Sequence, residues 1–122
     1  MIEDDLRLYP AFRKAILRDI PHGWLCILLD LGRALQLHDS SSHTVTIVFE
    51  AWVENHRLMV CARTNTAVPH LVNGVAWLVE QAECTSRWTC SECGARLGAK
   101  LRRIGKTDRR MILCAGCNGN AC

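Results

Sequence analysis

The sequence lacks the features that direct a protein to a membrane or out of the cell. Its first residues are acidic and show no basic stretch ahead of an apolar run, so no signal peptide is recognisable. The most apolar segment, Trp24 to Leu37, is too short to span a bilayer and contains Asp30 and Arg33. We therefore expect a soluble, cytoplasmic protein with no membrane contact.

Signatures of catalysis are also missing. The sequence has no phosphate-binding glycine loop, no Gly-x-Ser-x-Gly element and no carboxylate pair in a convincing setting. None of its 5 histidines follows Cys90, which argues against a His-containing nuclease motif, and the His-x-Glu element of zinc deaminases is absent. These absences predict a protein that is not an enzyme.

Cysteine, by contrast, is abundant, with 8 residues in the chain. Four of them form two Cys-x-x-Cys pairs near the C-terminus, Cys90 with Cys93 and Cys114 with Cys117. Two such pairs at this separation are typical of one zinc ion bound by four thiolates. Because four protein ligands leave no position for water, we expect a single structural Zn²⁺. The residues between the pairs, with strands at 97–104 and 109–113, would complete a zinc ribbon.

Two other interpretations of the paired cysteines are disfavoured. An even number fits a disulfide scaffold, but the missing signal peptide disfavours it. A redox pair would need a strand–helix context that the motif lacks. We expect the other four cysteines to be packing residues. For Cys84 and Cys122, which flank the module, a spare ligand or an exposed thiol is the alternative.

Charge divides the chain into two regions. Residues 1–86 have a net charge of −3 and residues 87–122 one of +6, or about +4 with zinc on four thiolates. We predict a body at 1–86 and a basic ribbon at 87–122. The basic residues expected to contact nucleic acid or another partner are Arg96, Lys100, Arg102, Arg103, Lys106, Arg109 and Arg110. They would contact phosphates or an acidic protein face, or form an ordinary solvated surface.

The body is predicted to be α+β, with helices packed on a two-stranded antiparallel hairpin. Hydrophobic spacing predicts helices over 10–19, 24–38 and from about 66 to 83–86. Alternation over 44–53 and 57–63 predicts the strands. A two-residue loop, Glu54-Asn55, would pair Val53 with His56 and Phe49 with Val60, and would set Arg57 opposite Trp52. The residues expected on the buried face of the first strand are Val45, Ile47, Phe49, Ala51 and Val53.

A likeness to a known group then emerges. The order Tyr9-Pro10-x-Phe12, Gly23-Trp24 opening an apolar helix, two strands, a helix, Cys90-x-x-Cys93-Gly94-Ala95 and Leu113-Cys114 resembles small uncharacterised zinc-ribbon proteins of bacteria and their phages. The likeness covers nearly the whole chain. In that group the last ligand is often His, whereas Cys117 stands here. The resemblance implies a fold and a metal, but no activity.

Two functional hypotheses follow. In the first, a non-enzymatic regulatory protein uses its basic ribbon on nucleic acid or a nucleoprotein complex. In the second, the zinc is purely structural and the chain is a protein–protein adaptor or inhibitor of phage or mobile-element type, with the hairpin making the contact. A homodimer through the sheet edge is a further hypothesis.

Overall fold

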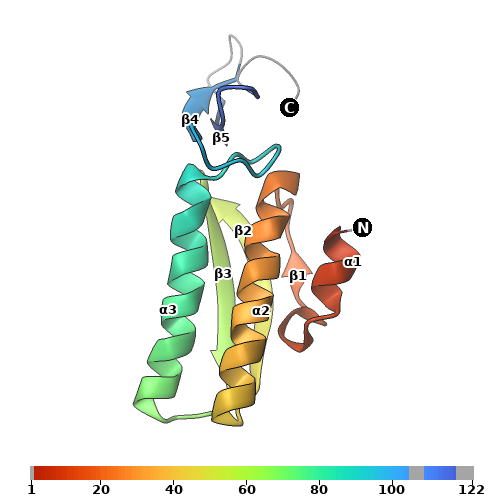
Figure 1. Ribbon diagram of the computed structural model, residues 1–122, viewed down its shortest axis with the longest axis vertical. Helices are drawn as coiled ribbons and strands as arrows, with labels where there is room; N and C mark the ends of the chain where they lie inside the picture. The colour runs from red at the N-terminus through yellow and green to blue at the C-terminus, as the bar shows by residue number, and fades with distance from the viewer. Residues whose placement is uncertain (1, 105–108, 118–122) are drawn as a thin grey trace.

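A computed structural model describes residues 2–104 and 109–117, and it has a mixed α+β fold as predicted. A three-stranded sheet, in the order β1-β2-β3, lies behind two long helices, and a two-stranded ribbon lies beyond one end of them (Figure 1). The elements, with 3₁₀ helices written η, are α1 (Ile2–Arg7), η1 (Pro10–Phe12), β1 (Ile16–Leu17), η2 (His22–Trp24), α2 (Leu25–Ser42), β2 (Thr46–Glu54), β3 (Arg57–Thr64), α3 (Pro69–Thr85), η3 (Ser86–Trp88), β4 (Lys100–Arg103) and β5 (Arg110–Leu113).

Helices α2 and α3 lie side by side on the same face of the sheet (Figure 1). In the apolar helix predicted over 24–38, Leu28, Leu31 and Leu35 are buried. On α3, Val75 and Ala82 are buried, whereas Val72, at the same helical spacing, is exposed. The apolar stripes of the two helices and one face of the sheet are buried against each other, and together they form the main core.

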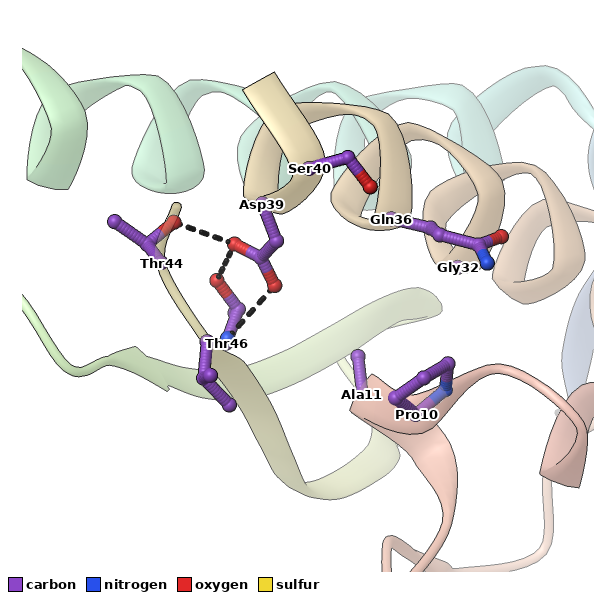
Figure 2. Close-up of a pocket in the computed structure, with 9 residues that line it drawn as sticks. Pro10, Ala11, Gly32, Gln36, Asp39, Ser40, Thr44 and Thr46 are labelled. Atoms are coloured by element: carbon purple, nitrogen blue, oxygen red, sulfur yellow. Dashed lines mark hydrogen bonds between the residues drawn. The ribbon is translucent and has the colours of Figure 1, made fainter. Parts of the chain in front are cut away.

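Helix α2 continues four residues past its predicted end at His38, as far as Ser42. The Asp39 carboxylate accepts hydrogen bonds from the Thr44 hydroxyl at 2.9 Å and from the Thr46 hydroxyl and backbone N–H, both at 2.8 Å (Figure 2). His43 adopts a left-handed φ of 54° where the helix stops. The carboxylate therefore fixes the end of α2 to the start of β2.

The β2–β3 hairpin forms, but in a different register from the predicted one. Its turn is Asn55-His56, with φ of 51° and 60°, as in the mirror-image turns that suit the twist of a hairpin. Val53 consequently pairs with Leu58. The predicted pairs Val53–His56, Phe49–Val60 and Trp52–Arg57 are wrong, and Met59 is the residue opposite Trp52.

A bulge in β2 changes which side chains face the helices. Val48 pairs with Ala62 and Glu50 pairs with Cys61, which leaves Phe49 as an extra residue. Val48 and Ala51 are both buried, three positions apart, whereas Ile47 and Phe49 are exposed. The prediction of one buried face from Val45 to Val53 is wrong because it assumed strict alternation.

The N-terminal segment also differs from its prediction. The helix expected over 10–19 is wrong: Pro10–Phe12 is a single 3₁₀ turn, and β1 follows, parallel to β2. The spacing of apolar residues in this short segment fits a helix and also a turn followed by a short strand. Periodicity therefore could not distinguish these two structures. Helix α1 was not predicted. It buries Leu6 fully, while Asp4 and Asp5 are exposed.

Candidate metal centre

Four sulfur atoms converge at the base of the ribbon. The Sγ atoms of Cys90, Cys93, Cys114 and Cys117 all lie within 4.8 Å of one another. The Sγ atoms of Cys93 and Cys114 are 3.7 Å apart. A tetrahedral shell with metal–sulfur bonds of about 2.3 Å places sulfur atoms about 3.8 Å apart, so the spacing suits a four-thiolate ion. These residues could hold a metal ion, as the spacing of the cysteines predicts.

Backbone hydrogen bonds shape the first Cys-x-x-Cys turn, residues 90–94. The Gly94 N–H donates to the Cys90 carbonyl at 2.9 Å, and the Cys90 N–H donates to the Ala95 carbonyl at 2.7 Å. Gly94 has a φ of 81°, in the left-handed region where a side chain would be strained. The Ser91 N–H donates to the Ile112 carbonyl at 2.7 Å and so joins this turn to β5.

The environment favours thiolate at one of the ligands. Burial raises the pKa of the Cys90 thiol, but hydrogen bonds from backbone N–H groups, those of Cys93 and Cys114 first, lower this pKa to about 7. The pKa of Cys93 is raised, because burial and the neighbouring Cys90 and Cys114 thiols outweigh its hydrogen bond from Ala95. Thiolates so close together repel one another. A bound cation would offset this repulsion, and its binding would displace the thiol protons.

The first Cys-x-x-Cys turn is seated on the body of the molecule. The Gly23 N–H donates to the Ser91 carbonyl at 2.8 Å, and the buried Trp24 Nε1–H donates to the Thr89 carbonyl at 2.8 Å. A Cβ atom on Gly23 would lie 2.3 Å from the Cys90 carbonyl oxygen, so the two backbones touch only because residue 23 is glycine. The 3₁₀ turn η2, directly before α2, therefore positions the candidate metal centre.

The basic residues predicted as binding residues are divided between two roles. Arg102 folds onto the ribbon, where its Nε donates to the Leu113 carbonyl at 2.9 Å and its Nη2 to the Gly98 carbonyl at 3.1 Å. Arg96 is 3.7 Å from the Asp30 carboxylate of α2. The remaining predicted residues on the described part of the ribbon are all exposed: Lys100, Arg103, Arg109 and Arg110. Lys106 lies outside the described residues.

The other cysteines are distributed differently from the prediction. Cys26 is half-buried against the core, as expected of a packing residue, and its Sγ donates to the Gly23 carbonyl. Cys61 is exposed, and the prediction that it packs is wrong. It lies on the side of β3 opposite Leu58 and Val60, which face the helices. Cys84 is half-buried, and Cys122 lies outside the described residues.

Comparison with protein-family models, with curated proteins and with solved structures gives no match. The resemblance to zinc-ribbon proteins of bacteria and phages therefore stays an expectation. Among the helices of the described residues, none combines the length and apolar character that crossing a bilayer requires. Function has to be inferred from the chain's own residues.

Two contributors to the centre were not identified as such from the sequence. Gly23 and Ser91 are 68 positions apart, and only the folded chain brings them together. The pair Gly23-Trp24 is a weak local signal, because a glycine beside a tryptophan at the start of a helix can mark a close backbone approach. Nothing in the sequence marks Ser91.

Proposed function

We propose that the chain is a non-enzymatic, zinc-binding regulatory protein whose ribbon contacts nucleic acid or a nucleoprotein complex. The observation that carries the proposal is the sulfur cluster at zinc spacing beneath a basic ribbon. Four thiolates form a soft donor set that favours zinc, and a closed shell gives the ion a structural role. The ion would hold the basic residues in a fixed arrangement.

The arrangement of charge on the ribbon favours an anionic partner. Arg103 of β4 is directly opposite Arg110 of β5, and both side chains are exposed. Like charges in a cross-strand pair destabilise the sheet by their repulsion. A phosphate placed between two guanidinium groups would relieve this repulsion and accept their hydrogen bonds. Phosphate contacts of this kind position a nucleic acid without reading its sequence.

A salt series with two variants tests the proposal. The double substitution Arg103→Gln and Arg110→Gln should weaken binding to a duplex or a single strand, and should reduce the dependence of log K on log salt by about 1 for each lost contact. Arg96→Gln is the matched control, because Arg96 is engaged with Asp30 on the body. Unchanged affinity and slope in the double variant would rule out phosphate contact by this pair.

A second candidate function, a protein adaptor or inhibitor, is favoured by the sheet face that α2 and α3 leave uncovered. Exposed side chains on it include Ile16, Ile47 and Phe49. Exposed apolar side chains on an uncovered sheet face are a feature of protein interfaces. In this case binding of a protein partner should persist at high salt and fail in Phe49→Ser, while the arginine variants should bind it normally.

A further inference from the structure

A cavity of about 250 Å³ lies where the ribbon meets the body. One wall is formed by residues 109–112, which include most of β5. The opposite wall comes from the segment before α2, which contributes Asp19, and from the hairpin tip, which contributes His56. The first Cys-x-x-Cys turn closes the cavity with Ser91. The cavity is therefore distinct from the sulfur cluster, although one turn contributes to both.

Ser91 is the unusual member of this lining. Its relative exposure is 2%, and its hydroxyl has no hydrogen-bond partner among the residues that the structure describes. Its backbone is fully used, since its N–H donates to Ile112 and its carbonyl accepts from Gly23. A buried hydroxyl without a partner destabilises the folded state, and native proteins rarely contain one that no ligand or water satisfies. Because Ser91 also lines the cavity, a molecule bound there could supply the missing partner.

The charges around the cavity define the chemistry of such a molecule. Arg109 and Arg110 supply two guanidinium groups, whose planar donors match the oxygen atoms of a phosphate. Asp19 supplies one carboxylate, which would repel a bare anion but accept hydrogen bonds from a hydroxyl or amino group. Val53 and Met111 add apolar surface between these groups. The lining suits a ligand with an anionic end and a donor-bearing, partly apolar remainder.

We propose that this cavity binds a small organic phosphate, of the size of a mononucleotide. Its phosphate lies against Arg109 and Arg110 and accepts a hydrogen bond from the Ser91 hydroxyl, and its hydroxyl or amino groups donate to Asp19. The cavity is small by the standard of ligand pockets of about 300–1,000 Å³, so part of the ligand extends into solvent. The site does not depend on nucleic-acid binding by the ribbon, although Arg110 serves both.

Calorimetric titration of the metal-loaded full chain tests the proposal, with inorganic phosphate and adenosine monophosphate as separate probes in a phosphate-free buffer. Saturable binding of the monophosphate, tighter than that of inorganic phosphate, is expected. Ser91→Ala and Arg110→Gln should each weaken it by about tenfold, the effect of losing one hydrogen bond to a charged group. Lys100→Gln is the control, because Lys100 is a ribbon cation that does not line the cavity.

Three outcomes would overturn the site. These are no binding of either probe at millimolar concentration, equal weakening in Lys100→Gln, and full binding in Ser91→Ala. Metal content and melting temperature of each variant establish that it is folded, and Arg110→Gln, at an exposed position, tests the site should Ser91→Ala fail to fold. Oligonucleotide binding by Ser91→Ala separates the two proposals, because it should stay normal when the cavity is lost.

Discussion

Gly23 is the residue at which the metal centre and the body come into contact. A Cβ atom there would lie 2.3 Å from the Cys90 carbonyl oxygen and 2.6 Å from the Gly94 nitrogen, both backbone atoms that cannot rotate away. Gly23→Ala should therefore displace the first Cys-x-x-Cys turn. We expect a loss of stability of about 1–3 kcal/mol or more, together with weaker metal binding. Denaturant unfolding and a competitive chelator titration measure the two effects.

Gly74→Ala is the matched control for this substitution. Gly74 lies within α3, and its Cβ would meet the end of the His38 side chain, which can move, at 3.1 Å. Alanine is also the better helix former, by roughly 0.5–1 kcal/mol. The control should keep full metal affinity. If Gly23→Ala behaved in the same way, the close contact at residue 23 would have no energetic weight.

The thiol of Cys90 predicts how metal binding depends on pH. Backbone hydrogen bonds lower its pKa to about 7, so it is largely thiolate above this pH and largely thiol below it. A metal ion binds the thiolate, and protons compete for the same sulfur. Protons compete at Cys93, whose pKa is raised, already at higher pH. Metal affinity should therefore fall as the pH is lowered, and more steeply below 7, where Cys90 also takes up a proton. Zinc titrations at pH 6, 7 and 8 would measure this, and equal affinities at pH 6 and 8 would contradict it.

At this scale the sequence identifies ligands better than their surroundings. The spacing of the two motifs identifies Cys90 and Cys114 as candidate ligands, because a four-thiolate site requires two such pairs. Ser91 and Gly23 have no such signature. Their roles come from a contact between segments that are far apart in the chain. A single sequence does not show that these two segments meet in the folded protein.

At the scale of elements, β3 is an edge strand whose outward N–H groups are partly covered by side chains. The Leu58 N–H donates to the Ser86 hydroxyl at 2.9 Å, and the Val60 N–H donates to the Glu83 carboxylate at 2.8 Å. Ser86 is fully buried and donates in turn to the Glu83 carbonyl. The end of α3 thus blocks part of the edge that a second chain would need for pairing.

Removing one of these acceptors should leave an N–H group of the edge strand without a partner. Ser86→Ala leaves the Leu58 N–H buried without its partner, which should destabilise the fold by about 1–3 kcal/mol. It should also raise the tendency to associate, measured by sedimentation at increasing concentration. Thr85→Ala is the neighbouring control, because the Thr85 hydroxyl donates within α3 to Gln81. Ser86→Ala with wild-type stability and no new association would contradict this role.

Elements with a long, regular stripe were predictable, and short or irregular ones were not. Val75 and Ala82 on α3, like Leu28 and Leu35 on α2, repeat the helical period over several turns. In β2, the extra residue Phe49 interrupts the period of two. A one-residue bulge of this kind cannot be recognised from the sequence of one strand without its pairing to the neighbouring strand. The two-residue strand β1 is too short to show any period at all.

At the scale of the molecule, the ribbon and the body share buried surface. Ile112 of β5 belongs to the same buried cluster as Trp24 and Leu28 of the body. The Trp24 side chain also donates to the Thr89 carbonyl across the boundary predicted at residues 86 and 87. Loss of a bound metal should therefore destabilise the helices as well as the ribbon.

Chelation tests this coupling. Removing the metal should lower the melting temperature of the whole chain, because binding to the folded state alone stabilises it by mass action. Tryptophan fluorescence and far-ultraviolet circular dichroism should change together in one transition when metal is bound. A body whose melting midpoint is the same with and without chelator would show that the two parts fold independently.

The seat of the first Cys-x-x-Cys turn on Gly23 has a consequence for how the chain is made. The ribosome adds residue 23 long before residue 91, so the Trp24 side chain has no acceptor on Thr89 until a further 65 residues have been added. A nascent or truncated chain that ends before Cys90 would leave this site bare and accessible to proteases and chaperones. The site is covered once the segment that contains Thr89, Cys90 and Ser91 has been made and has folded against it.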